Sequence, residues 1–147
     1  AAKASLGWTG TMVSSAPLTD EQYLGASGPS AEGTLGLCHF PDPEISQEPG
    51  LRTYRAAMEK YHPGRPVNRY TLYGYVFGRL MLDALVRAGR DLTRDGFVQA
   101  LEATRNWQSG GIIPPVTFGP DNHQAQRAAL PSRLENGRFV HSGGWSE

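Results

Sequence analysis

Ser14 and Ser15 carry the hydroxyl groups best placed for ligand chemistry in this sequence. They follow a short strand candidate at residues 11–13 and lead through Ala16-Pro17 into a helix candidate at 18–24. In open α/β sheets, ligands bind outside the carboxyl ends of the strands. Two hydroxyls and a helix N-terminus with free backbone N–H groups would suit a carboxylate or another polar ligand. The alternative is a serine turn in which these side chains satisfy their own backbone.

The other reactive side chains form no recognisable catalytic or metal pattern. The four histidines lie far apart, and none is spaced four residues from another or combined with cysteine at zinc spacing. Asp121-Asn122-His123 adjoins Gly119-Pro120 and is interpreted as a turn, with a metal or catalytic role as the alternative. Cys38 is the single cysteine and lies in an apolar run, which indicates a buried small hydrophobe. We expect no enzyme, no cofactor and no metal site.

The composition is that of a globular domain without a strongly charged surface. The chain has 147 residues, of which 39% are hydrophobic and 19% charged, with 14 basic and 14 acidic side chains. This balance argues against a nucleic-acid-binding protein, which would show a basic face. It also argues against a polybasic membrane anchor, and the longest apolar run is far shorter than the ~18 residues of a spanning helix.

The first part of the chain has the pattern of a parallel βαβ unit. The strand candidate at 11–13 is followed by a helix at 18–24, with Thr19 as its N-cap and Gln22 completing a capping box. A buried strand is expected at 34–40. Strand, helix and strand in this order favour a parallel pair and an α/β fold.

Three helices are expected in the middle of the chain. The first starts at Pro49-Gly50 and the last at Thr93, its N-cap. The strongest helix covers 68–88 and ends at Gly89. The expected apolar positions are Leu51, Tyr54, Met58 and Tyr61 on the first helix, and Tyr70, Tyr73, Phe77, Leu80, Met81, Ala84, Leu85 and Ala88 on the second.

Short strands are expected near the end of the chain. Candidates lie at 116–118, 128–130 and 138–140, and Asn136-Gly137 indicates a hairpin turn. Frequent Gly and Pro residues separate these pieces, as is usual between strands.

The order of several short motifs resembles the second half of the periplasmic branched-chain amino acid binding proteins, the solute receptors of ABC transporters. Each motif alone is weak, but their order and spacing cover nearly the whole chain. The motifs are Gly7-Trp8, Met12-Val13-Ser14-Ser15, Leu18-Thr19-Asp20-x-x-Tyr23-Leu24, Ser30-Ala31-Glu32-Gly33-Thr34, Tyr54-x-x-x-Met58-x-x-Tyr61, Tyr73-Gly74-Tyr75, Ala88-Gly89, Leu92-Thr93-Arg94-x-x-Phe97, Pro115-Val116-Thr117-Phe118, Asp121-Asn122-His123 and Gly137-Arg138-Phe139.

The resemblance implies a type I periplasmic binding protein fold, with two Rossmann-like lobes joined by three crossovers and ligand between them. Residues 1–38 would belong to the second lobe. Residues 39–118 would supply helices of the first lobe, with hinge crossings near 39–44 and 118–120. Residues 119–147 would return to the second lobe.

The opening residues are interpreted as the end of a helix. Ala1–Trp8 has the pattern of a last helical turn stopped at Gly7, with no cap before it. With the resemblance, this makes the chain the later part of a longer receptor. The apolar stripe of 70–88 would have to pack on a sheet to be buried. We therefore expect association with a missing N-terminal half or with a second copy.

The resemblance also implies the ligand contacts. Ser14, Ser15 and Ala16 would contact ligand from the second lobe, and a residue near Asn68–Tyr70 would contact it from the first. In the branched-chain amino acid receptors, an acidic residue lies about where Ser15 lies and pairs with the ligand ammonium. Ser15 carries no charge, and relatives with uncharged residues there include receptors for aromatic acids and other carboxylates.

The function implied is an extracytoplasmic receptor that captures a small amino acid or an organic acid, aromatic acids included, by lobe closure for an ABC permease. It would be periplasmic or extracellular, made with a signal sequence, and lipid-anchored in a Gram-positive organism. It would bind no nucleic acid and meet the membrane only through the permease. The alternative is a ligand-sensing regulatory or signalling domain of the same fold, which uses closure to report and not to transport.

Overall fold

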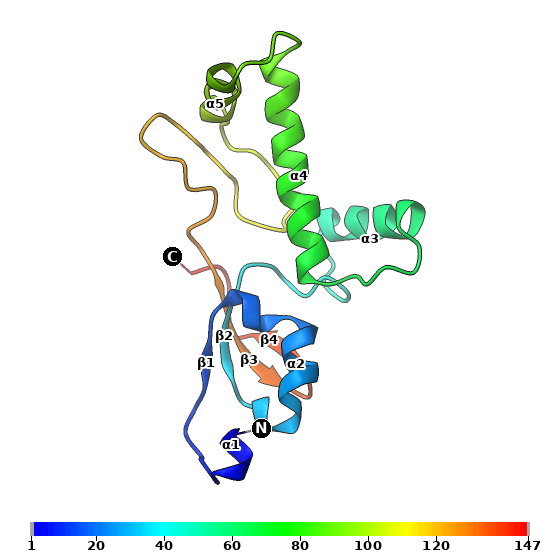
Figure 1. Cartoon of the computed structure of the whole chain (residues 1–147), viewed down its shortest axis with the longest axis vertical. Helices are drawn as coiled ribbons and strands as arrows, with labels where there is room; N and C mark the ends of the chain where they lie inside the picture. The colour runs from blue at the N-terminus through cyan, green and yellow to red at the C-terminus, as the bar shows by residue number, and fades with distance from the viewer. Residues whose placement is uncertain (1, 147) are drawn as a thin grey trace. The chain divides into compact units, whose positions relative to one another are not determined.

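The computed structural model describes residues 2–146, without the side chains of Ala2, Ala4, Glu21, Gln22 and Tyr23. The chain divides into two compact units. Ala1–Asp42 and Ala128–Glu147 form the first, called here the sheet unit, and Pro43–Arg127 form the second, the helical unit. Figure 1 shows that the sheet unit combines the first and last parts of the chain, whereas the green helices belong to the helical unit. Their assignment to lobes of a larger receptor remains a prediction.

The sheet unit contains a four-stranded mixed sheet in the order β1-β2-β3-β4. β1 pairs in parallel with β2, while β2–β3 and β3–β4 are antiparallel. The parallel pair is connected through helical segments, which confirms the βαβ prediction. The elements of this unit are α1 (Ala2–Ser5), β1 (Val13–Ser14), η1 (Ala16–Thr19), α2 (Glu21–Ser27), η2 (Gly28–Ala31), β2 (Leu35–Cys38), β3 (Leu130–Glu135) and β4 (Arg138–His141).

Two turn predictions in this unit are confirmed. Asn136 and Gly137 have φ values of 52° and 77°, the left-handed pair that a two-residue hairpin between β3 and β4 needs. Gly7 follows α1 with a φ of 59°, as expected of a residue that stops a helix.

An ion pair joins the β3–β4 hairpin to the chain that follows β2. In this pair Arg138 Nη1 lies 3.1 Å from Asp42 Oδ2.

The strand predicted at 34–40 is shorter than expected and buried on one face only. Gly36 and Cys38 point into the core, whereas Leu35 and Leu37 on the other face are exposed. Cys38 is free and buried, as predicted. Only one face of β2 is buried because the core lies on one side of the sheet. It is formed by Ala31, Cys38, Leu130, Leu134 and Phe139, with Leu24 of α2 packed against it.

The prediction that Thr19 is an N-cap is wrong. Thr19 is the last residue of η1 and fully buried, and its hydroxyl donates to the carbonyl of Ala16 at 2.7 Å. Pro17 lies in the first turn of η1, where its fixed φ starts a 3₁₀ turn before the predicted cap. The α-helix therefore begins later, at Glu21. The predicted capping-box role of Gln22 lies outside the described side chains.

The helical unit contains the three predicted helices, α3 (Pro49–Tyr61), α4 (Arg69–Ala88) and α5 (Arg94–Glu102). The Thr93 hydroxyl accepts from the Gly96 N–H at 3.0 Å, which confirms the predicted cap of α5. Gly89 follows α4 with a φ of 79°. None of the helices within residues 2–146 has both the length and the hydropathy that a membrane crossing requires.

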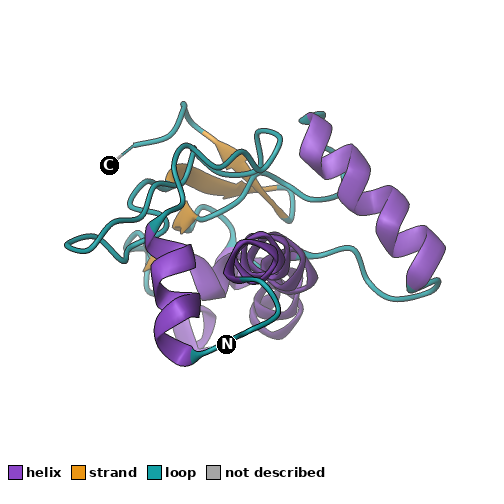
Figure 2. Cartoon of the chain, turned by 90° about the horizontal axis from the view of Figure 1, so that it is seen from above, coloured by secondary structure: helices purple, strands orange, loops and turns teal. Residues whose placement is uncertain are grey.

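A long connection without regular helix or strand follows α5 and is drawn as loop in Figure 2. The strand predicted at 116–118 is reduced to one bridge between Val116 and Trp107. The strand predicted at 128–130 starts as an Ala129 bridge to Ser146 and continues as β3 to Glu135. The predicted strand was therefore too short at its C-terminal end. Pro131 stands second in the strand, where a missing N–H is tolerated.

The predicted apolar stripe of α4 is only partly buried. Leu80 and Ala84 are buried, but Tyr70 and Met81 are 46% and 54% exposed. The buried row is instead Arg69, Leu72, Val76, Leu80 and Ala84. Tyr61, expected on the buried face of α3, is exposed as well. The described residues thus cover one side of α4, while part of the stripe faces solvent.

Candidate functional site

Ser14 and Ser15 lie at the carboxyl end of β1, as predicted. Ser14 is buried, and its Oγ donates to the carbonyl of Leu35 across the parallel pair at 3.4 Å. Ser15 is exposed and precedes η1 without forming a side-chain cap. A serine turn from Ser15 to the residue two positions on is impossible, because Pro17 has no N–H. The two hydroxyls therefore differ in role. The Ser14 hydroxyl forms a hydrogen bond between β1 and β2, whereas the Ser15 side chain is exposed.

The expectation of a helix N-terminus with several free N–H groups at this strand end is wrong. The segment that follows is the single 3₁₀ turn η1. Pro17 contributes no N–H, and the Leu18 N–H donates to the Ser15 carbonyl at 3.0 Å. Ala16 is buried at this point of the chain. At this strand end the hydroxyl of Ser15 and the N–H of Ala16 can donate to a ligand.

His39 lies at the same edge of the sheet and was missed as a site candidate. It directly follows β2, and parallel strands present their carboxyl ends at one edge. Burial lowers the pKa of His39 below its usual 6.5, because desolvation disfavours the charged imidazolium. His39 thus places a partly buried imidazole directly after this end of β2. The strand–helix–strand pattern could have identified it, since it fixes which residues follow the second strand.

Asn68 and Tyr70 lie in the helical unit, at the start of α4. Asn68 is buried, and its Oδ1 accepts from the Thr71 N–H at 2.9 Å, which makes it the N-cap of α4. The Asn68 carbonyl accepts from the Tyr54 hydroxyl at 3.3 Å. Tyr70, in the first turn, is exposed. The Asn-x-x-Thr pattern before a helix was the sequence signal for this cap, and it was not used.

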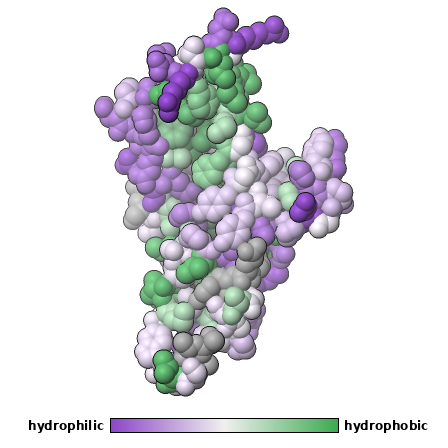
Figure 3. Space-filling view, viewed as in Figure 1, coloured by the Kyte–Doolittle hydropathy of each residue, from purple (hydrophilic) through white to green (hydrophobic). Residues whose placement is uncertain are grey.

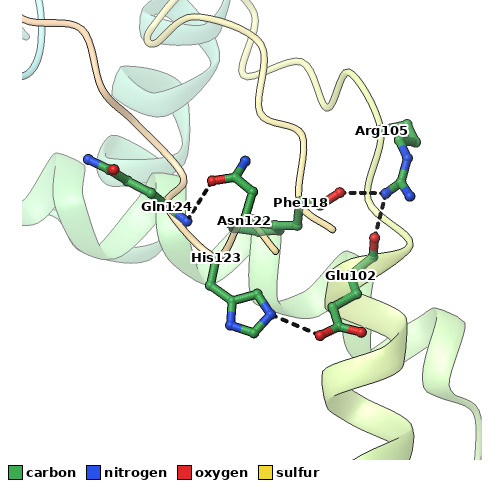
Figure 4. Close-up of polar contacts among 6 residues, drawn as sticks. All are labelled: Glu102, Arg105, Phe118, Asn122, His123 and Gln124. Carbon is green, nitrogen blue, oxygen red and sulfur yellow. Dashed lines mark hydrogen bonds and ion pairs between the residues drawn. The ribbon is translucent and has the colours of Figure 1, made fainter. Parts of the chain in front are cut away.

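The Asp121-Asn122-His123 segment is a turn, as interpreted from the sequence. Gly119 and Asn122 exchange two backbone hydrogen bonds of 3.0 Å. His123 Nε2 lies 2.8 Å from Glu102 Oε1, which joins the turn to the end of α5 (Figure 4). Arg105 donates to the carbonyl of Phe118 at 2.6 Å. Among the side chains that the structure describes, no three His, Cys, Asp or Glu residues are grouped closely enough to hold a metal ion.

The sequence matches the model of a periplasmic binding protein family over residues 1–138. The chain therefore belongs to this family, which consists of solute-binding receptors and not of enzymes. A search of curated proteins finds no match.

Three solved structures illustrate the similarity of fold. A possible leucine/isoleucine/valine-binding protein from Rhodopirellula baltica has 24% identity and a TM-score of 0.83, over 97% of this chain and 38% of that chain. The leucine binding protein LivK from Thermotoga maritima has 23% identity and a TM-score of 0.74, over 95% and 38%. A branched chain amino acid ABC transporter from Thermus thermophilus with bound valine has 19% identity and a TM-score of 0.79, over 99% and 41%.

These likenesses show the type I periplasmic binding protein fold. The chain spans about two fifths of the length of the structures that it matches.

Proposed function

We propose that this chain is part of an extracytoplasmic receptor that captures a small amino acid or organic acid and delivers it to an ABC permease. Membership of the periplasmic binding protein family and the shared fold support this role. The observation that carries the proposal is the outward-facing Ser15 at the carboxyl end of β1, beside the N–H of Ala16. Strand ends of this kind are where open α/β sheets bind ligands.

The donors at this strand end favour a carboxylate group. A hydroxyl and a backbone N–H both donate to carboxylate oxygens, and hydrogen bonds to a charged acceptor contribute about 1.5–3 kcal/mol. Ser15 has no charge with which to pair a ligand ammonium. An organic acid, aromatic acids included, is therefore favoured over an α-amino acid. Ser14 would act indirectly by fixing β1 to β2 through Leu35.

Ligand capture would occur by closure of two lobes around the solute. We place the hinges where the chain passes from one compact unit to the other, near residues 42–43 and 127–128. We place further contacts at Asn68 and Tyr70. Of these two, Tyr70 has the exposed side chain, whereas the Asn68 oxygen already caps α4. Closure must match each polar group of the ligand with a partner, because an unmatched buried group costs about 1–3 kcal/mol.

Isothermal titration calorimetry of the full-length receptor that contains this chain tests the proposal. The titrants are aromatic acids, aliphatic carboxylates and amino acids. We expect binding of a carboxylate that weakens about tenfold in Ser15→Ala, which corresponds to one lost hydrogen bond of ~1.4 kcal/mol. Thr9→Ala, an exposed hydroxyl in the same unit, is the matched control and should leave affinity unchanged. Failure to bind any small solute would count against the proposal.

A further inference from the structure

Each compact unit buries apolar residues of its own. Cys38 and Phe139 belong to the core of the sheet unit. The buried residues of the helical unit include Leu51, Tyr54, Leu72, Val76 and Ile112. Figure 3 shows further hydrophobic surface along the C-terminal half of α4, which also belongs to the helical unit. Units with separate cores can move as bodies, and the motion then falls on the few residues that connect them.

The first crossing of the chain, at Asp42–Pro43, is held to the sheet unit up to its last residue. Phe40 is fully buried, and the Asp42 side chain is only 8% exposed. Asp42 Oδ2 accepts a hydrogen bond from Arg138 Nη1 of β4 at 3.1 Å. Asp42 is also the residue at which this part of the sheet unit ends. The chain is therefore fixed to the sheet unit until it leaves that unit.

The helical unit holds the chain from its first residue. Arg55 Nη1 donates to the carbonyl of Pro43 at 2.9 Å and to that of Ser46 at 3.0 Å. Arg55 lies within α3, so its guanidinium joins Pro43 to the body of the helical unit. Two arginines from different units thus hold adjacent residues, Asp42 and Pro43, and a single peptide bond connects the two points.

The backbone at the first crossing has little rotational freedom. Pro41 and Pro43 each have φ fixed by the pyrrolidine ring. A proline also confines the residue before it to extended conformations, which applies to Phe40 and Asp42. The first crossing is therefore short, stiff and held on both sides.

The second crossing, residues 124–128, has a different character. His123 Nε2 lies 2.8 Å from Glu102 Oε1 of α5, in the helical unit. Ala129 exchanges two backbone hydrogen bonds of 2.8 and 2.9 Å with Ser146, in the sheet unit. The five residues between His123 and Ala129 contain no proline, so each keeps two rotatable backbone dihedrals. This crossing is longer and less restricted than the first.

We propose that the Asp42–Pro43 linkage is the fixed pivot of lobe closure, held by Arg138 on one side and by Arg55 on the other. Residues 124–128 then supply the change in path length that rotation about this point requires. A fixed pivot limits the open arrangements of the lobes, so less conformational freedom is lost when they close. For its part in solute capture, the pivot rests on the proposed function.

Distances between spin labels in the full-length receptor that contains this chain test the pivot without any solute. The labels are attached at Thr9→Cys in the sheet unit and Arg90→Cys in the helical unit, both exposed positions. Cys38 is buried, and other accessible cysteines of the receptor are replaced. Double electron–electron resonance then gives the width of the distance distribution, which reports how freely the two units move.

The same insertion at each crossing gives a matched comparison. Two glycines inserted between Asp42 and Pro43 separate the two held points while leaving both arginines in place. This change should widen the distance distribution at least twofold, because glycine adds freely rotating residues. Two glycines inserted between Gln124 and Ala125 should widen it by less than a fifth.

Substitutions of Arg138 test the ion pair itself. Arg138→Gln should widen the distribution at least 1.5-fold, whereas Arg138→Lys keeps a cation for Asp42 and should retain most of the original width. Arg133→Gln, an exposed arginine of β3, is the control and should leave the width unchanged. Glu135 lies opposite Arg138 in the strand register, so the insertions, which alter neither residue, provide the independent test. Circular dichroism checks that each variant keeps its secondary structure.

Three results would overturn the pivot. They are an unchanged width after insertion at the first crossing, equal widening by both insertions, and equal widening by Arg138→Gln and Arg133→Gln. A receptor that binds no small solute would contradict the proposed function instead, because the label distances are measured without ligand.

Discussion

Gly36 of β2 lies directly against the ring of Phe139 in β4. A Cβ on Gly36 would come 2.8 Å from Phe139 Cε1 and 2.7 Å from Thr19 Cγ2, closer than real Cβ contacts come. Glycine at this position lets the aromatic ring of the hairpin and the buried turn of η1 meet over the parallel strand. The same contact places Thr19 in the core.

We expect Gly36→Ala to destabilise the chain by about 1–3 kcal/mol, because added volume in a packed core forces its neighbours to move. The matched control is Gly25→Ala in α2, where an added Cβ meets nothing within 4 Å. That change should be neutral or stabilising by about 0.5–1 kcal/mol, since alanine favours helix. Urea denaturation of both variants measures the difference. Equal stabilities would contradict the packing argument.

At the start of α4, Asn68 has a structural role, whereas Tyr70 is a proposed ligand contact. Asn68→Ala removes the cap of α4 and should lower the free energy of unfolding by about 1 kcal/mol. Asn68→Asp keeps the accepting oxygen and should retain most of the stability. Tyr70→Ala changes an exposed side chain and should leave stability nearly unchanged while weakening solute binding. Thermal unfolding and calorimetric titration of the three variants test this assignment.

His39 should make stability depend on pH in a defined direction. Burial holds its pKa below the usual 6.5, so the unfolded chain binds a proton at His39 more readily than the folded chain does. Its contribution is fully present above pH 6.5 and is lost as pH falls from about 6.5 towards the lower pKa of the folded state. Urea denaturation between pH 7.5 and 4.5 measures this dependence.

The matched variant for this titration is His39→Gln, which keeps a polar side chain that does not ionise. As pH falls, the free energy of unfolding of the wild type should decrease relative to that of the variant. All other groups titrate in both chains, so their effects cancel in this comparison. A difference that is constant with pH, or that shifts towards the wild type, would show that burial does not control this imidazole.

Caps and turns could be predicted from the sequence where no neighbouring residue favoured a different backbone geometry. Thr93 before α5, Gly89 after α4 and Asn136-Gly137 between β3 and β4 each specify one backbone geometry, and each occurs as predicted. The prediction that Thr19 caps a helix failed because Pro17, two residues earlier, starts a 3₁₀ turn that includes Thr19.

Apolar periodicity has a different limit. It identified α4, but it could not tell that Tyr70 and Met81 stay exposed while Val76 is buried, because periodicity does not reveal which neighbours cover each side. The same holds for the candidate site. The strand-end position of Ser15 follows from local pattern, whereas its separation from Ser14 depends on the pairing of β1 with β2.

The uncovered face of the sheet leads to a last prediction, which concerns association. Val13 pairs with Leu35, Leu35 with Arg133, and Arg133 with Val140, so these four side chains form one row across the sheet. Val13 is 74% exposed and Val140 48%, and Leu37 continues the same face two residues along. Apolar residues gathered on one face mark an interaction surface.

We therefore expect the 147-residue chain by itself to associate through this face, either with a second copy or with the remaining part of a receptor supplied in trans. Light scattering across a concentration series should show a mass above that of one chain. Leu37→Lys should shift the equilibrium towards the monomer, because it places a charge in the contact. Leu92→Lys, an equally exposed leucine of the helical unit, should not. A wild-type monomer that unfolds cooperatively would contradict the prediction that this face requires a partner.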